Sequence, residues 1–218
     1  MDNCSTDNSV DNINDLYESR PGLRVICQKD CGVYDAMNRG VEIAKGRYIY
    51  FLGAGDTLCE GALDSIIRML PPHDYGFLYG NVRWGQSEYD GPFTPLKLIE
   101  KNICHQSIFY GRKVFDILGG YNLAYSVLAD YELNLRCMGS SKVKKQYVPI
   151  LVANYEGGGL SDRVNDRVFG ADKKKLVRKH LGFTISARFS FRNSWNKVMN
   201  DYPSVSQHLP SWMHSSRH

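Results

Sequence analysis

Residues 47–58 read RYIYFLGAGDTL, an apolar and aromatic run that ends in two glycines and an aspartate. The run RYIYFL (47–52) is apolar or aromatic at nearly every position, which is typical of a parallel strand buried on both faces. Gly53 and Gly55 break the strand and leave room for the close approach of a ligand or another backbone segment. The stretch predicts a central strand with a carboxylate, Asp56, just beyond its carboxyl end.

Strand and helix patterns alternate on both sides of that strand. The sequence predicts strands over 23–27, 76–82, 105–110 and 146–153, and helices over 33–45, 60–70, 112–118, 127–138 and 163–181. This alternation predicts an α/β fold with a mainly parallel sheet flanked by helices. From residue 183 onward the aromatic residues are scattered and show no firm pattern.

Composition and charge narrow the class of protein. Hydrophobic content is 43% and charged content 23%, both ordinary for a globular domain. The six cysteines include no CxxC pair, so neither a disulfide framework nor a zinc cluster is expected. The polar N-terminus is neither a signal peptide nor a transit peptide, and no apolar run is long enough to span a membrane. These features predict a cytoplasmic chain.

Charge is distributed unevenly along the chain. Residues 1–141 hold 13 Lys and Arg against 18 Asp and Glu, a net charge of −5. Residues 142–197 hold 13 against 4, a net charge of +9. The acidic N-terminal segment suits metal and phosphate chemistry, and the basic C-terminal segment suits attraction to an anionic surface. The basic residues match no nucleic-acid-binding module, so no nucleic-acid partner is expected.

Three polar side chains in the first half of the chain are candidates for either a structural or a ligand-binding role. In an open α/β sheet, ligands lie at the carboxyl ends of strands, where Asp56 could hold a divalent cation; alternatively it caps the next helix. Asp35 falls in the first turn of its helix, where a carboxylate suits the helix dipole. Asn38 is a poor interior helix residue, which hints that something binds it.

The region after residue 100 adds two further candidates. Asp130 either starts or caps a helix, or it lies at the floor of a cleft, where it could take a proton from an acceptor hydroxyl. His105 could hydrogen-bond a substrate or be structural. The glycine-rich loop at 157–161 could close over a substrate or simply turn the chain.

Seven segments then occur in a familiar order. They are DNCSTDNS (2–9), KDCGVYDAMNRG (29–40), RYIYFLGAGDTL (47–58), FLYGNV (77–82), ICHQSIFYGR (103–112), LGGYNLAYSVLADYELNLR (118–136) and EGGGLS (156–161). The series resembles the family 2 glycosyltransferases with the Rossmann-like GT-A fold, and looks closest to bacterial members that build capsule, exopolysaccharide or O-antigen. The resemblance covers roughly residues 1–162.

The resemblance implies a role for each candidate residue. Asp130 matches the catalytic base, and Asp56 matches the last acid of the motif that holds a divalent cation, manganese or magnesium. The residues that match positions binding the nucleotide sugar are Asp56, Asp2, Asn3, Asp35 and Asn38. The residues that match positions on the acceptor side are His105 and Gln106.

Two departures from the family pattern qualify this expectation. Ala54-Gly55-Asp56 stands where the family often has Ser-Asp-Asp, so weaker metal binding is expected. Family members carry a strand, a helix and a strand before the DNCSTDNS-like turn, whereas this sequence starts at that turn. The expected fold is therefore a GT-A domain over residues 1–162, truncated at its N-terminus, followed by a basic helical C-terminal extension over residues 163–218. The alternative is a non-catalytic remnant that binds nucleotide or partners.

The implied reaction is an inverting transfer from a nucleoside-diphosphate sugar to a saccharide or polyprenyl-linked acceptor, as in cell-surface polysaccharide biosynthesis. The basic segment, residues 142–197, is interpreted as a peripheral contact with the anionic inner membrane face, where polyprenyl-linked acceptors would lie. The alternative is a solvated helix face.

Overall fold

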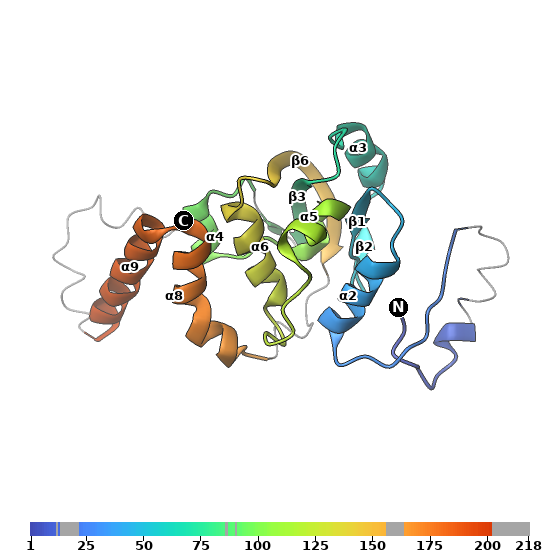
Figure 1. The fold of residues 1–218 in the computed structure, drawn as a ribbon, viewed down its shortest axis with the longest axis horizontal. Helices are drawn as coiled ribbons and strands as arrows, with labels where there is room; N and C mark the ends of the chain where they lie inside the picture. Colours follow the sequence, from blue (N-terminus) through green and yellow to red (C-terminus); the bar gives the residue numbers. More distant parts are fainter. Residues whose placement is uncertain (12, 14–21, 86, 90, 156–163, 202–218) are drawn as a thin grey trace.

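The run 47–52 forms strand β1 (Tyr48–Tyr50) at one end of a curved sheet. The computed structural model describes residues 1–11, 13, 22–85, 87–89, 91–155 and 164–201. In these residues the sheet has six strands in the order β1-β5-β3-β6-β2, with β4 paired to β3. The other strands are β2 (Thr57–Leu58), β3 (Gly76–Trp84), β4 (Ser87–Tyr89), β5 (Ile108–Gly111) and β6 (Lys144–Tyr155). Helices cover the sheet on both faces (Figure 1).

The predicted α/β class is confirmed, but the sheet is mixed and not mainly parallel. Among the strand pairs in the described residues, only β3 and β6 run parallel. Strand β5 lies antiparallel between β1 and β3, and β2 lies antiparallel on β6. The reason is that an apolar run indicates burial and gives no direction, because a buried strand has the same composition whichever way its neighbour runs.

Five predicted helices are confirmed; the helix at 112–118 has the predicted bounds, and the ends of the others differ from the predicted ones by at most four residues. They are α2 (Val33–Ile43), α3 (Ala62–Met69), α5 (Arg112–Leu118), α6 (Ala129–Gly139) and α8 (Arg167–Leu181). Helix ends are the least certain part of any assignment from periodicity, because capping and tertiary contacts decide them. The predicted 163–181 helix begins at Arg167, where Asp166 caps it.

Several elements were not predicted. Helix α4 (Pro95–Glu100) has a recognisable start, because Thr94 accepts a hydrogen bond from the Lys97 amide and Pro95 occupies the first turn. The predicted strand 105–110 begins as the short 3-10 helix η1 (His105–Ser107) and becomes β5 only at Ile108. Residues 183–201 lie in the extension that was expected to be helical, but no separate helix was predicted there; they form helix α9 (Phe183–Asp201), which packs against α8.

The predicted strand 23–27 is mostly wrong. Its described pairing is a single parallel bridge between Asp2 and Cys27, with the Asp2 amide donating to the Ile26 carbonyl and the Gln28 amide donating to the Asp2 carbonyl. A strand is maintained by its ladder of hydrogen bonds, and one bridge does not sustain five residues in a sheet.

The two faces of the sheet carry separate cores, and strand β3 shows the division. Phe77 and Tyr79 belong to the larger core, together with buried residues of α2, α4, α5, α6 and α8. Leu78 and Val82 point the other way and pack with Ile66 of α3. This alternation follows from the period of two along a strand. The larger core is rich in tyrosine and phenylalanine.

Helix α8 is tied firmly to the rest of the fold. Phe169, Leu176 and Val177 join the larger core. Asp166 Oδ1 accepts from the Phe169 amide at 3.0 Å, and its Oδ2 accepts from the amides of Val127 (3.0 Å) and Leu128 (3.1 Å). The segment before α6 is thereby bonded to the start of α8. No helix in the described part of the chain is long and apolar enough to cross a membrane.

Candidate active site

Asp130 lies in the first turn of α6 and is 6% exposed. Asp130 therefore lies at the start of the helix, as predicted, but it does not cap it, because the N-cap residue is Leu128 and no side chain caps the helix there. Instead, Asp130 Oδ2 accepts a hydrogen bond from Asn102 Nδ2 at 2.7 Å. Asp130 Oδ1 accepts from the Tyr34 hydroxyl at 2.9 Å. Two neutral donors thus orient a buried carboxylate.

Tyr34 links this carboxylate to helix α2. Its hydroxyl also lies 2.6 Å from the Val127 carbonyl oxygen, so one proton is shared between that oxygen and Asp130. Burial raises the pKa of Tyr34, and the Asp130 charge raises it further. The phenol therefore stays protonated and acts as a donor. Sequence reasoning missed both Tyr34 and Asn102; the signal available for Tyr34 was its place inside the GVYDAMN motif.

Asp56 lies at the end of the tight turn that follows β1. Its amide donates to the Gly53 carbonyl at 3.2 Å. The following residues form β2, and helix α3 begins at Ala62 with Gly61 at its N-cap. Asp56 is therefore not the cap of that helix, because the pairing of β2 with β6 separates it from the helix start.

Gln106 holds the Asp56 carboxylate in place. Its Nε2 donates to Asp56 Oδ2 at 2.6 Å, while its Oε1 accepts from the Cys104 thiol at 2.8 Å. Burial raises the pKa of Cys104 to about 12, so the thiol remains a donor. The Gln106 carbonyl oxygen accepts from the Tyr50 hydroxyl at 2.8 Å. A Cβ on Gly53 would lie 2.6 Å from Asp56 Oδ2, which explains the glycine at that position.

His105 faces the second carboxylate, Asp130. Its Nδ1 lies 3.9 Å from Asp130 Oδ2. Burial lowers the pKa of His105, although the charges of Asp130 and Asp56 oppose that shift. A lowered pKa keeps the imidazole mainly neutral near pH 7, able to donate and accept hydrogen bonds. Because His105 and Gln106 are consecutive in η1, this single turn faces Asp130 with one residue and Asp56 with the next.

The remaining predicted residues are engaged in local contacts. Asp2 accepts a hydrogen bond from the Ser5 amide at 2.9 Å, and Asn3 Oδ1 accepts from the Asp30 amide at 2.9 Å. Asp35 accepts from the Cys31 amide at 3.0 Å and pairs with Arg39 at 2.9 Å. These contacts link Asn3 to Asp30 and link Cys31 to helix α2. The glycine-rich loop at 157–161 lies outside the described residues.

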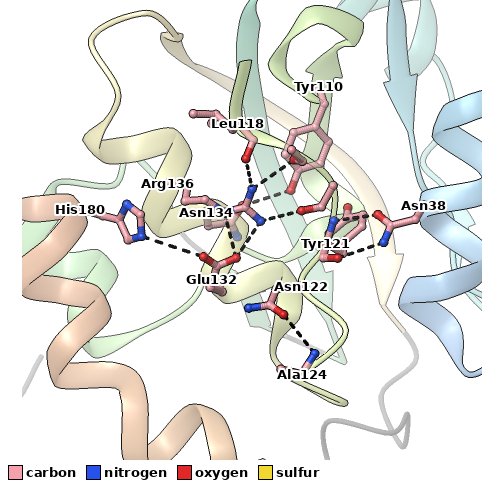
Figure 2. Close-up of polar contacts among 12 residues, drawn as sticks. Asn38, Tyr110, Leu118, Tyr121, Asn122, Ala124, Glu132, Asn134, Arg136 and His180 are labelled. Carbon is pink, nitrogen blue, oxygen red and sulfur yellow. Dashed lines mark hydrogen bonds and ion pairs between the residues drawn. The ribbon is translucent and has the colours of Figure 1, made fainter. Parts of the chain in front are cut away.

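Asn38 is bound by the protein itself. Its Oδ1 accepts from the Tyr121 amide at 2.7 Å, and its Nδ2 donates to the Tyr121 carbonyl at 2.9 Å (Figure 2). This pair of bonds explains a residue that is unfavourable inside a helix. A contact between Asn38 and a nucleotide-sugar donor remains a prediction.

A buried ion pair supports the loop that Asn38 binds. Arg136 Nη2 lies 2.7 Å from Glu132 Oε2; the Glu132 side chain is buried, and the Arg136 side chain is 12% exposed. Figure 2 shows the Arg136 guanidinium aimed at the loop between α5 and α6, where it donates to the carbonyls of Leu118 (2.5 Å), Gly119 (3.1 Å) and Gly120 (2.7 Å). The missed signal was the Glu-x-x-x-Arg spacing on one helix.

The residues present set a limit on how a metal could be held. No group of three His, Cys, Asp or Glu side chains suited to a metal occurs within the described ranges. Asp56 offers one carboxylate beside an amide donor. This set fits a magnesium-type ion held by one carboxylate and by the oxygens of a bound diphosphate, and it does not fit an all-protein cage.

A cavity of about 450 Å³ opens between α2 and α5, away from both carboxylates. Its lining consists of Asn38, Val41, Glu42, Ala44, Arg112, Phe115, Asp116, Gly120 and Tyr121. Because the cavity is adjacent to the Asn38–Tyr121 contact and not to Asp56 or Asp130, it does not mark the candidate site.

Comparison with known proteins gives a consistent set of matches. The sequence model of the family described as glycosyl transferase family 2 matches residues 1–123 of this chain. A protein of Mycobacterium tuberculosis described as PGL/p-HBAD biosynthesis glycosyltransferase is 41% identical over 182 residues, covering 78% of this chain and 69% of that protein. The hyaluronan synthase of Pasteurella multocida is 27% identical over 149 residues, covering 64% of this chain and 15% of that protein.

Solved structures are similar in fold. The crystal structure of Staphylococcus aureus TarS 1–349 has a TM-score of 0.54 at 14% identity, and it covers 71% of this chain. This chain spans about half of that one, 49%. The TarS 1–349 complex with UDP-GlcNAc has a TM-score of 0.56 at 13% identity, covering 83% of this chain and 61% of that chain.

Proposed function

Because this chain belongs to glycosyl transferase family 2 and has the GT-A fold, we propose that it moves a sugar from a nucleoside-diphosphate sugar to a hydroxyl group of a saccharide or lipid-linked acceptor, with inversion at the anomeric carbon. One observation carries the proposal. The η1 turn faces two carboxylates at once, since His105 Nδ1 lies 3.9 Å from Asp130 and Gln106 donates to Asp56 at 2.6 Å. This geometry supports a site in which the donor binds beside Asp56 and the acceptor beside Asp130.

Asp130 is the proposed base. An acceptor oxygen forms a bond to the anomeric carbon as the bond from that carbon to the diphosphate oxygen breaks. The acceptor proton passes to Asp130, and the nucleoside diphosphate leaves with the bonding electron pair. The hydrogen bonds from Tyr34 and Asn102 fix the carboxylate for this transfer. One displacement without a covalent sugar–enzyme intermediate inverts the anomeric carbon.

Asp56 is the proposed donor-side ligand. A divalent cation held there by one carboxylate and the donor diphosphate would offset the charge that develops on the leaving group. Gln106 keeps the carboxylate oriented towards that position. Asp2, Asn3, Asp35 and Asn38 are proposed to contact the nucleotide sugar. The support for a nucleotide donor comes from the TarS structures, which hold UDP and UDP-GlcNAc.

The acceptor and its location are proposed from chemistry and from the relatives. The matched relatives include proteins named for PGL/p-HBAD biosynthesis and for hyaluronan synthesis, which supports a cell-surface glycan as the product. Helix α8 exposes Lys174, Lys175, Arg178 and Lys179, and these cations would hold the chain at the inner, anionic face of a membrane. Co-sedimentation with phosphatidylglycerol vesicles should therefore weaken as salt is raised. Salt-insensitive behaviour would remove this part of the proposal.

The test of the reaction is release of nucleotide from a panel of nucleoside-diphosphate sugars, with Mg²⁺ or Mn²⁺ and simple saccharide acceptors. Asp130→Asn should lower turnover by about 10²–10⁴-fold, because a general base contributes that much, while donor binding persists. Asp64→Asn, an exposed carboxylate on α3, serves as the control and should leave turnover unchanged. Turnover in Asp130→Asn at the level of the unmodified chain would refute the assignment.

A further inference from the structure

A second cavity lies between α8 and α9, at the opposite end of the molecule from α2 and β1 (Figure 1). Its volume is about 460 Å³, and its lining consists of Gly170, Lys173, Lys174, Phe189, Ser190 and Ser194. The α8 residues are spaced i, i+3 and i+4, so they share one face of that helix. Two lysines and two serines therefore meet across one opening.

Lys173 is the central cation of this cavity. Its ammonium lies 4.7 Å from the centre of the Tyr131 ring and 5.5 Å from that of the Phe189 ring. Among the residues that the structure describes, no carboxylate lies within ion-pair distance of Lys173. The neighbouring Asp172 accepts a hydrogen bond from the Tyr125 hydroxyl at 3.0 Å and does not line the cavity. The Lys173 side chain is partly buried, and this burial lowers its pKa.

We propose that the cavity between α8 and α9 binds a phosphate group, with Lys173 and Lys174 as its cationic ligands. A partly dehydrated ammonium between two aromatic rings gains most from an anion that replaces its missing water. Two adjacent lysines and the Ser194 hydroxyl favour a doubly charged group with several acceptor oxygens over a single carboxylate. The Ser190 hydroxyl also lines the cavity, but it donates its proton to the Ser186 carbonyl oxygen at 3.0 Å. Gly170 leaves the space open, because a Cβ there would meet nothing within 4 Å.

The proposed phosphate site is separate from the sugar-transfer site and does not depend on it. Tyr131 presents its ring to Lys173, whereas the preceding residue, Asp130, is bonded to Tyr34 and Asn102. Two sources could supply the phosphate: a free phosphate ion or the phosphomonoester headgroup of a lipid. The same side chains would recognise either.

The first experiment measures binding of inorganic phosphate by calorimetry at constant ionic strength. Lys173→Ala should weaken binding at least tenfold, and Lys173→Arg should retain it to within a few-fold. Lys175→Ala, an exposed lysine on the same helix outside the cavity, should leave it unchanged. Gly170→Leu keeps both lysines and fills the opening, so it should also abolish binding while the thermal melt stays cooperative.

The second experiment identifies the source with vesicles of matched charge that contain phosphatidic acid or phosphatidylglycerol. Retention on phosphatidic acid that is lost in Lys173→Ala identifies a lipid phosphomonoester; phosphate binding without such a preference identifies the free ion. Asp130→Asn should bind phosphate normally, which separates this test from that of the reaction. The proposal is overturned if the unmodified chain does not bind phosphate, or if Lys175→Ala weakens binding as much as Lys173→Ala.

Discussion

Single residues around η1 organise the candidate site. The carboxylates of Asp56 and Asp130 are each held by neutral donors, Gln106 for the first and Tyr34 with Asn102 for the second. Neutral donors orient a carboxylate without cancelling its charge, so it remains available to a cation or to a proton. The donors to Asp130 should therefore affect kcat, and the donor to Asp56 should affect the metal requirement.

On the acceptor side, Tyr34→Phe removes a hydrogen bond to Asp130 and keeps the ring. We expect kcat to fall about tenfold, because a bond to a charged group contributes roughly 1.5–3 kcal/mol and part of the loss is recovered by rearrangement. The donor KM should stay unchanged, since Tyr34 acts through Asp130. Tyr125→Phe loses a bond to Asp172 instead and should leave kcat unaltered in the same assay. A matching loss in both variants would assign Tyr34 a purely structural role.

On the donor side, Gln106→Met frees Asp56 from its amide donor. The concentration of Mg²⁺ or Mn²⁺ needed for half-maximal rate should rise about tenfold, equivalent to about 1.4 kcal/mol. The rate at saturating metal should recover most of its original value. Gln146→Met, an exposed position on β6, is the matched control. If the metal requirement does not change, Gln106 does not position Asp56 for a metal.

At the scale of elements, Asp166 joins helix α8 to the segment before α6. Its carboxylate is 4% exposed and accepts hydrogen bonds from three backbone amides. Burial by itself raises the pKa of Asp166, but the amides of Phe169, Val127 and Leu128 outweigh it, so the pKa lies below the ordinary value of 3.8. The carboxylate therefore stabilises the fold when ionised. That contribution is complete above the pKa of the unfolded chain and is lost as pH falls through the lower pKa of the folded one.

Asp166→Asn should accordingly lower the free energy of unfolding by about 1–3 kcal/mol at pH 7, because an amide offers one acceptor oxygen in place of two. The difference between the two proteins should shrink as pH falls below 3.8 and the native carboxylate is protonated. Urea unfolding at several pH values measures both quantities. Asp64→Asn should show no such difference. A gap that widens in acid would contradict the stated sign.

At the scale of the whole molecule, one ion pair connects several elements. Arg136 of α6 binds Glu132 on its own helix and the carbonyls of the loop after α5, and that loop binds Asn38 of α2 through Tyr121. His180 of α8 lies 4.0 Å from the same glutamate (Figure 2). Helices distant in sequence are thus joined through one buried charge pair.

Arg136→Met should destabilise the protein by about 3–5 kcal/mol, since it leaves the Glu132 charge buried without its partner. The double variant Glu132→Gln with Arg136→Met should be less destabilised than the single one, because the uncompensated charge is gone. Arg39→Met breaks an i,i+4 pair that is more exposed and should cost less than about 1 kcal/mol. Denaturant unfolding compares the three. Equal losses for Arg39 and Arg136 would show that burial does not set the cost.

Much of the fold could be predicted because local patterns match the elements that form. Buried strands such as 76–82 carry continuous apolar residues, and helices such as α3 end before prolines. Strand direction could not be predicted, since it depends on the route of the chain after each strand. Helix α9 was not recognised as a separate helix because its phenylalanines, serines and asparagines are weak helix formers. In the structure this helix packs against α8.

By itself, the sequence determined the α/β class, most elements and the two carboxylates that the candidate chemistry needs, because these depend on periodicity and on side-chain type. Only the tertiary structure decided that neither Asp56 nor Asp130 caps a helix, and that η1 places His105 against one and Gln106 against the other. It also supplied Tyr34, Asn102 and the Arg136 network. Hydrogen bonds between residues tens of positions apart depend on how strands and helices pack, and no local pattern records that packing.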